Sequence, residues 1–120
     1  MTKLQDLSTT DWHARAARLK YETRHCIDGE FVESLGGGRL TVVNPSTDAP
    51  LVDCCAGGSA DIDRAVAAAK RCFYSRTWSR KAPRDRMAVL QRLARLIEAN
   101  AERLALLDTL CMGKPIRDML

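Results

Sequence analysis

The sequence predicts an α/β fold with two short β-hairpins and about four helices. Two turn signals predict the hairpins, Asp28-Gly29 in CIDGEFVES and the NPST turn at residues 44–47. From Ser59 onward, apolar residues recur every third or fourth position instead of every second, which predicts helices. The expected order within residues 1–120 is a leading helix in residues 1–24, β-hairpins in residues 25–55 and further helices in residues 59–112.

The leading segment STTDWHARAARLKYETR predicts an amphipathic helix. Trp12, Ala16 and Leu19 fall on one helical face because their spacing follows the helical period. The residues just before this face have short polar side chains that cap helix N-termini: Ser8, Thr9 and Thr10. We therefore expect the first helix to begin in this polar run.

Each hairpin has its own turn chemistry. Asp28 and Gly29 both tolerate positive φ, so they suit a tight turn between the β-prone stretches on either side. The run Gly36-Gly37-Gly38 predicts a flexible loop that leads into the strand RLTVV. After the NPST turn, PLVDCC reads as the returning strand of the second hairpin.

The helical part begins at Ser59, which can cap a helix whose positive end favours Asp61 and Asp63. The stripe expected to be buried on this helix consists of Ile62, Val66, Ala69 and Phe73. The loop SRTWSRKA ends this helix, and Pro83 suits the first turn of the next. The apolar face of that second helix consists of Met87, Leu90, Ala94 and Ile97.

A break at Asn100 precedes the last predicted helix. Its apolar stripe consists of Leu104, Leu107 and Cys111. Gly113 is expected as the C′ residue that ends it, and Pro115 follows. Cys111 would then lie on the core side of the last turn. Because a helix C-terminus disfavours a thiolate and both histidines are distant in sequence, we interpret Cys111 as an inert thiol.

Composition favours one soluble unit in a reducing compartment. The hydrophobic content of 46% allows one modest core, and the net charge of +4 is spread along the chain. Five cysteines form no CxxC pair, and the start MTKLQDLSTTDW lacks the apolar core of a secretory signal. No apolar run is long enough to span a membrane. We therefore expect a cytoplasmic protein with no membrane contact.

Three patterns could carry chemistry, and each is better explained as structure. PLVDCCAGGSADID has the strand-glycine-helix order of a phosphate site, but two aspartates in the first helical turn would repel phosphate. The candidate metal ligands lack the close pairing of zinc sites: Cys26, Cys54, Cys55, Cys72, His13 and His25. The arginines of residues 76–103 alternate with acidic and apolar residues, as on a solvated helix face. We predict no catalytic, cofactor-binding or metal-binding residue and no nucleic-acid partner.

Four sequence pieces occur in a specific order: Asn44-Pro45-Ser46-Thr47, the helix from Asp61 to Phe73, Trp78 with the arginines after it, and Gly113-Lys114-Pro115. Through these pieces, residues 25–116 resemble the N-terminal part of the coenzyme-binding domain of aldehyde dehydrogenases. The leading DWHARAARLKYETR is similar to the branch that oxidises γ-glutamyl-γ-aminobutyraldehyde and related amino-aldehydes in putrescine breakdown.

The resemblance implies an enzyme that oxidises a small-molecule aldehyde to a carboxylic acid with NAD or NADP, and that forms a homo-oligomer. In the family a cysteine thiolate attacks the aldehyde, hydride passes to the cofactor and a glutamate activates water. Both catalytic residues and the dinucleotide-binding turns lie downstream of the matched region. The resemblance thus makes the chain an N-terminal fragment, α+β by itself, which is expected to be inactive and to bind no cofactor alone.

The resemblance also bears on a structural cation. Many members carry aspartate where Cys111 stands, and that carboxylate holds a cation together with strand carbonyls that Val42 and Val43 would supply here. A neutral thiol is a poor ligand for a hard cation, which prefers oxygen. We therefore do not predict this metal.

A second hypothesis is a small basic, non-catalytic module that binds protein or nucleic acid. Only composition supports it, and the downstream coding sequence would discriminate between the two. The fragment hypothesis makes a structural prediction of its own. The apolar stripes of the helices would lack the sheet on which they normally pack, so they should be exposed.

Overall fold

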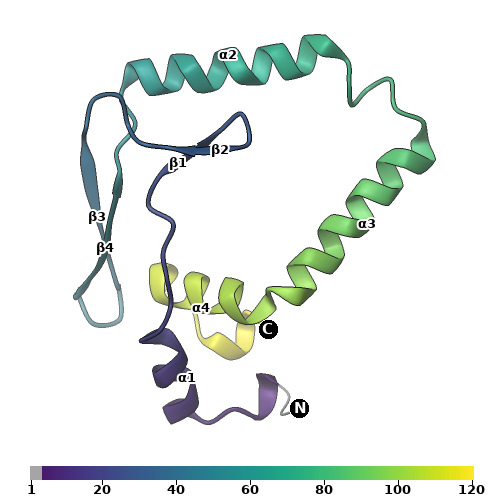
Figure 1. Cartoon of the computed structure of the whole chain (residues 1–120). Coiled ribbons are helices and arrows are strands. Elements are labelled where there is room, and N and C mark those ends of the chain that lie inside the picture. The colour runs from purple at the N-terminus through teal and green to yellow at the C-terminus, as the bar shows by residue number, and fades with distance from the viewer. Residues whose placement is uncertain (1–3) are drawn as a thin grey trace. The chain divides into compact units, whose positions relative to one another are not determined.

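The computed structural model describes residues 4–120, in which a first helix is followed by the strands and then by the remaining helices (Figure 1). In chain order they are a 3-10 turn at Leu4–Asp6, α1 at Thr9–Ala16, β1 at His25–Ile27, β2 at Glu30–Val32, β3 at Arg39–Val43, β4 at Pro50–Cys55, α2 at Ser59–Ser75, α3 at Pro83–Ala99, α4 at Ala101–Met112 and a 3-10 turn at Ile116–Asp118. Strands β1 and β2 form one two-stranded sheet, and β3 and β4 form another. The prediction of two hairpins and about four helices is confirmed.

The described residues divide into two compact units. The first consists of residues 4–21, 42–51 and 93–120, and the second consists of residues 22–41 and 52–92. Within residues 4–120, none of the helices is both long and apolar enough to cross a membrane.

The first hairpin lies in the second unit and has the predicted turn. Asp28 and Gly29 have φ values of 58° and 82°, so both turn residues are left-handed, as a two-residue hairpin turn requires. The strands pair antiparallel, with Cys26 opposite Phe31. Ile27 is buried at 7% exposure, and the guanidinium of Arg24 lies 5.4 Å from the centre of the Phe31 ring. Phe31 is 52% exposed, so the face that carries Ile27 is the one that turns inward.

The NPST turn between β3 and β4 is held by Asn44. The Ser46 N–H donates to its side-chain oxygen at 2.9 Å, and the Asp48 N–H donates to its carbonyl at 2.8 Å. The Asn44 N–H in turn donates to the carbonyl of Ala49 at 2.9 Å. An asparagine that bonds the backbone two residues on forms an Asx turn, which explains why this residue starts the reversal.

Helix α1 begins as predicted but ends early. Ser8 is its N-cap, and Ser8 and Asp11 form a capping box. The helix stops at Ala16, so Leu19 lies beyond it and the expected helix over residues 8–24 is too long. Farther along, in the second unit, the Thr23 carbonyl accepts a 2.8 Å hydrogen bond from the N–H of Cys55. That bond to β4 favours extended backbone where the sequence alone suggested helix.

Helix α2 differs from expectation in its cap and in its buried face. Gly58 is the N-cap and Ser59 is the first helical residue, so the predicted serine cap is wrong by one position. Only Asp61 and Ala68 are buried on this helix. The predicted core stripe is exposed instead, with Phe73 at 75%. Exposure of this stripe is what the fragment hypothesis predicts, because a helix buries an apolar face only where another element covers it.

The boundaries of α3 and α4 follow the predicted signals. Pro83 is the first residue of α3, Asn100 separates the two helices, and Gly113 ends α4 with a φ of 73°. The apolar face predicted for α3 is exposed, as on α2: Met87, Leu90 and Ile97 are all more than half exposed. Local signals thus set the start and the end of these helices, whereas the apolar face of α3 stays exposed.

The buried face of α4 was predicted wrongly. Ala105 and Leu106 are buried at 2% and 5%, whereas Leu104 and Cys111 are exposed. The reason is the neighbour of this helix within the first unit. Arg15 of α1 pairs with Glu102 of α4, and Leu106 lies one turn further along the same face. Cys111 therefore does not lie on the core side of the helix.

Candidate functional site

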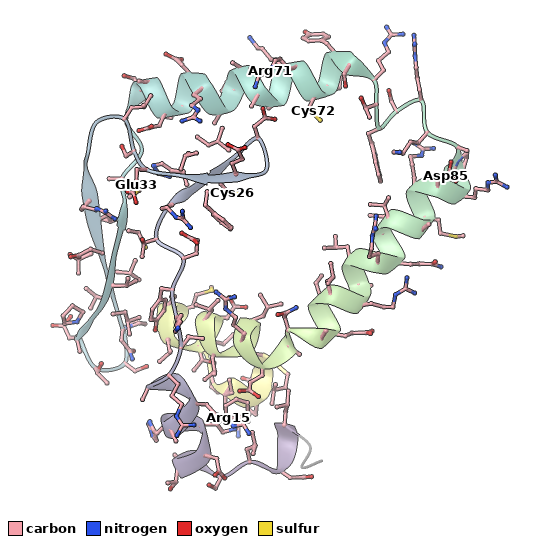
Figure 2. The ribbon with its side chains drawn as sticks, in the orientation of Figure 1. Arg15, Cys26, Glu33, Arg71, Cys72 and Asp85 are labelled. Carbon is pink, nitrogen blue, oxygen red and sulfur yellow. The ribbon has the colours of Figure 1, made fainter. Side chains whose placement is uncertain are left out.

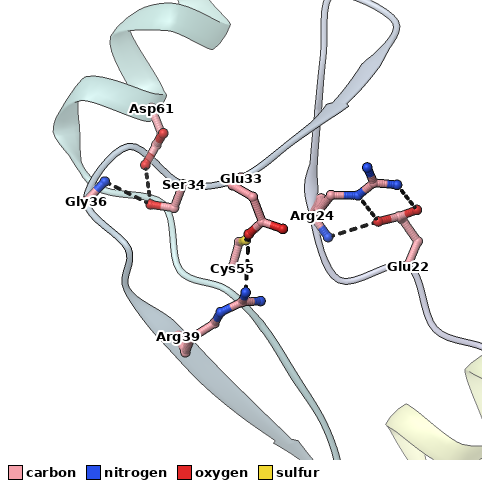
Figure 3. A network of polar contacts seen from close by, with 8 residues as sticks. All are labelled: Glu22, Arg24, Glu33, Ser34, Gly36, Arg39, Cys55 and Asp61. Atoms are coloured by element: carbon pink, nitrogen blue, oxygen red, sulfur yellow. Dashed lines mark hydrogen bonds and ion pairs between the residues drawn. The ribbon is translucent and has the colours of Figure 1, made fainter.

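The first turn of α2 is the most buried polar site in the described chain. Asp61 is 4% exposed, and its carboxylate accepts from the Ser34 hydroxyl at 2.8 Å, the Leu35 N–H at 3.0 Å and the Gly58 N–H at 3.1 Å. Figure 3 shows the carboxylate meeting the Ser34 hydroxyl at the end of the helix. The site therefore joins the loop after β2 to the start of α2.

The pKa of Asp61 is lowered by these contacts. The Leu35 N–H contributes most, followed by the Ser34 hydroxyl and the Gly58 N–H, and nearby His25 adds a smaller effect in the same direction. Burial opposes them without reversing the direction. The carboxylate is therefore anionic at neutral pH, in a place where the helix dipole also favours negative charge.

The bond between Gly58 and Asp61 at the start of α2 bears on whether the strand-glycine-helix segment can bind a phosphate group. A phosphate site needs backbone N–H groups at a helix N-terminus that are open to the ligand. Here the Gly58 N–H is already bonded to Asp61, and the carboxylate charge lies where a phosphate charge would lie. The buried carboxylate therefore disfavours a pyrophosphate group at this helix start.

A second polar cluster surrounds Glu33 in the same unit (Figure 3). Arg39 on β3 pairs with Glu33 at 3.2 Å, and the Cys55 thiol donates to the same carboxylate oxygen at 3.1 Å. These bonds connect the end of β2 to β3 and β4. Both ionic side chains are about half exposed, so screening by water limits the strength of the pair.

Glu22 and Arg24 form a two-bond ion pair just before β1. The guanidinium contacts the carboxylate at 2.8 Å and 2.9 Å, which is the fork geometry that arginine favours. These bonds lower the pKa of Glu22 to about 2 and raise the pKa of Arg24. Because the partners are two residues apart, the pair orders its own segment and does not connect distant ones.

The cysteines and histidines that could be imagined as ligands are dispersed. Cys26 lies on β1 and Cys72 on α2, and both are exposed (Figure 2). Cys54 and Cys55 are half-buried neighbours at the end of β4. His25 packs against Gly57, and within residues 4–120 its Nε2 atom is buried without a hydrogen-bond partner. Among these residues the structure gathers no group of three potential metal ligands.

In the first unit, the structure brings together two of the motifs that carry the family resemblance. The NPST turn lies against the glycine of the GKP motif, since a Cβ built on Gly113 would be 3.0 Å from Cγ of Pro45 and 3.5 Å from Oγ of Ser46. Motifs separated by more than half the chain therefore form one contact. Cys111 lies two residues before this glycine, and its charge is a secondary cause, after burial, of the raised pKa of Tyr21.

The contacts of these residues define a scaffold of caps, turns and ion pairs. The residue that sequence reasoning missed is Asp61, which was expected only to favour a helix dipole. Its spacing of three from Gly58 was a capping signal that could have been read. Its bonds to Ser34 and Leu35 had no local signal, because those residues are more than twenty positions away.

Comparison with known proteins assigns this scaffold to a class. Residues 31–120 match the model of the aldehyde dehydrogenase family, which is most of the chain. The chain therefore belongs to the aldehyde dehydrogenase family.

Individual relatives align with nearly the whole chain. It is 46% identical to the NADP/NAD-dependent aldehyde dehydrogenase PuuC of Escherichia coli (strain K12) over 91% of its length, and 39% identical to an aminoacetaldehyde dehydrogenase of Pseudomonas aeruginosa over 98%. The crystal structure of a gamma-glutamyl-gamma-aminobutyraldehyde dehydrogenase from Burkholderia cenocepacia J2315 superposes with a TM-score of 0.90 at 41% identity, over 94% of this chain.

The chain spans less than a quarter of the length of these relatives. It covers 22% of the Escherichia coli protein and 23% of both the Pseudomonas aeruginosa protein and the Burkholderia cenocepacia chain. The resemblance inferred from the sequence is therefore confirmed at the level of the family. Residues 31–120 now define the matched region, beginning a few residues after the start we inferred.

Proposed function

We propose that this chain is the N-terminal part of an NAD- or NADP-dependent aldehyde dehydrogenase that oxidises an aldehyde to a carboxylic acid. The observation that carries the proposal is the family match over residues 31–120. The substrate class we favour is an amino-aldehyde of the kind formed in putrescine breakdown. Two relatives support this choice by name, the aminoacetaldehyde dehydrogenase and the gamma-glutamyl-gamma-aminobutyraldehyde dehydrogenase.

In this proposal the chain contributes scaffold and leaves the chemistry to other parts of the protein. We assign no catalytic, cofactor-binding or metal-binding residue to residues 1–120. The glycine-rich start of α2 does not fit a dinucleotide, because Asp61 already occupies its backbone donor. The exposed stripes of α2 and α3 support a place at the edge of a Rossmann-like coenzyme domain, where a sheet would cover them.

The remaining parts of the proposal concern cell compartment and assembly. We place the enzyme in the cytoplasm as a homo-oligomer that does not use nucleic acid or a membrane as a partner. The alternative of an independent basic module is less well supported, because the family match accounts for the helices and turns that composition alone left unexplained.

The decisive experiment measures nicotinamide reduction by the purified product of the gene that contains this segment. We expect turnover with a panel of amino-aldehydes and with NAD, NADP or both. Simple aliphatic aldehydes of equal length serve as controls for the amino group. Failure to reduce either cofactor with any aldehyde, by a folded protein, would refute the proposed activity. Equal turnover of both aldehyde series would refute only the choice of substrate.

A further inference from the structure

A pocket of about 640 Å³ lies between α1, the residues that follow it and α4, entirely within the first unit. Its floor includes the buried Leu106. Its charged lining residues are Arg15, Arg18, Lys20, Arg103, Asp11 and Glu102. Four cations against two carboxylates give the pocket an excess of positive charge.

Both carboxylates already have partners. Asp11 accepts from the backbone N–H of Ser8 at 3.0 Å and from its hydroxyl at 2.6 Å, and these bonds lower the pKa of Asp11. Glu102 pairs with the guanidinium of Arg15. Both carboxylates of the lining are therefore bonded to residues of the same unit, and the charge of Arg15 is neutralised by Glu102.

The remaining cations of the pocket lining make few hydrogen bonds or ion pairs within the fold. Arg103 makes one hydrogen bond, from Nη2 to the carbonyl of Lys20 at 3.2 Å. The side chains of Arg18 and Lys20 have no hydrogen bond or ion pair with any residue in the described range 4–120. Two charged groups thus line a pocket without an internal partner.

Helix capping does not account for these basic residues. Side chains of arginine and lysine after a helix often satisfy its last carbonyls. At the end of α1, the carbonyls of His13, Arg15 and Ala16 instead accept from the backbone N–H groups that follow, at 3.0 Å to 3.1 Å. The side chains of Arg18 and Lys20 are therefore available to a ligand.

We propose that this pocket binds a small multivalent oxyanion, with the phosphoryl or dicarboxylate group held by Arg18, Lys20 and Arg103. Guanidinium and ammonium groups give charge-assisted hydrogen bonds to such oxygens, and the guanidinium fork can hold two of them at once. These three side chains are exposed, so salt should screen the attraction. The proposal goes beyond the function proposed above, which assigns no substrate-binding or cofactor-binding residue to residues 1–120.

Calorimetric titration of the protein with inorganic pyrophosphate at low ionic strength tests the proposal. We expect saturable binding that weakens as chloride is added, because the lining charges are accessible to screening. Replacing both Arg18→Gln and Lys20→Gln should weaken binding by about tenfold, since two charge-assisted contacts are lost. The matched control replaces both Arg92→Gln and Arg95→Gln, which removes two exposed cations that do not line the pocket. Binding that is absent at concentrations on the order of 1 mM, or equally weakened by the control, would overturn the site.

A variant with the opposite expected effect sharpens the test. Glu102→Gln frees Arg15 from its partner and removes one negative charge, so pyrophosphate should bind several-fold more tightly if the pocket is the site. A melting curve of each variant shows whether α1 and α4 remain packed. A folded Glu102→Gln protein with unchanged affinity would contradict the assignment. Competition by succinate distinguishes a carboxylate ligand from a phosphoryl ligand, and either result is consistent with an oxyanion site.

Discussion

Helices α1 and α2 begin with the same local device and are held in very different ways. In each, an aspartate three positions after the N-cap accepts a hydrogen bond from the N-cap backbone, Asp11 from Ser8 and Asp61 from Gly58. The partners of Asp11 are confined to the capping residue, and its side chain is exposed. Asp61 is buried and also accepts from Ser34 and Leu35, which belong to another part of the chain.

The difference shows that one sequence signal can serve two structural purposes. At α1 the carboxylate orders a single helical turn, because every bond it makes is local. At α2 it is a tertiary connection, because the loop after β2 depends on it for two of its hydrogen bonds. Loss of the first should fray one helix end, whereas loss of the second should separate the loop from the helix.

The largest expected effect is that of Asp61→Asn. The amide nitrogen would face donors that now meet a carboxylate oxygen, and a buried donor without an acceptor is costly. We expect a lower melting temperature than in Ser34→Ala or Ser8→Ala, together with faster hydrogen exchange at the Leu35 amide. Asp63→Asn is the matched control, since it removes an exposed carboxylate from the same helical turn. Equal melting temperatures for Asp61→Asn and its control would show that the buried cap adds no stability.

Acid should reproduce much of this loss. The pKa of Asp61 is lowered from 3.8 in the folded state, so its contribution to stability is fully present above that value and is lost as pH falls below it. The pKa of Asp11 is lowered in the same direction, so its smaller local contribution disappears in the same acidic range. Carboxylate titration by NMR, with unfolding followed in parallel, measures both. A folded-state pKa at or above 3.8 for Asp61 would contradict the described contacts.

Ser34→Ala should have an intermediate effect. It removes one of the donors to Asp61 and leaves the two backbone donors in place, at a cost of about 1 kcal/mol in the free energy of unfolding. A double variant with Asp61→Asn tests the connection directly. If the two residues act through one bond, the double variant should lose less than the sum of the single losses. Simple additivity would mean that Ser34 stabilises the loop independently of Asp61.

The smallest effect should come from Ser8→Ala. This change removes the N-cap hydroxyl of α1, and about 0.5 kcal/mol is expected because the cap is exposed at the end of a short helix. Hydrogen exchange should speed up at the first amides of α1 and stay unchanged around Asp61. Altered exchange at the Leu35 amide would indicate that the two caps are coupled, against the local role of the first.

The features that could be predicted from sequence are those fixed by a few neighbouring residues. The Asp28-Gly29 turn, the helix start at Pro83 and the helix end at Gly113 each depend on the φ values that a particular residue allows. The family could also be inferred, because its motifs combine such local signals in a fixed order.

The errors concern which face of a helix is covered. The spacing of Leu104, Leu107 and Cys111 is helical, but spacing does not reveal which face has a neighbour. The buried residues of α4 are Ala105 and Leu106 instead. The stripe on α2 is exposed, as the fragment hypothesis predicts, because no described element covers Phe73. The partners of Asp61 could likewise not be predicted from the sequence, because Ser34 and Leu35 belong to a loop that is distant in the chain.

The glycine at position 113 has a consequence for handedness. Its φ of 73° is strained for an L-residue, and its missing side chain leaves the space that Pro45 occupies. These are separate constraints, and only an achiral residue meets both among the genetically encoded ones. D-alanine would adopt this φ without strain, and its methyl group would not take the Cβ position that lies 3.0 Å from the Pro45 ring. A semisynthetic protein carrying D-alanine should therefore be more stable than Gly113→Ala, and the difference measures the whole cost of an L-residue at this position.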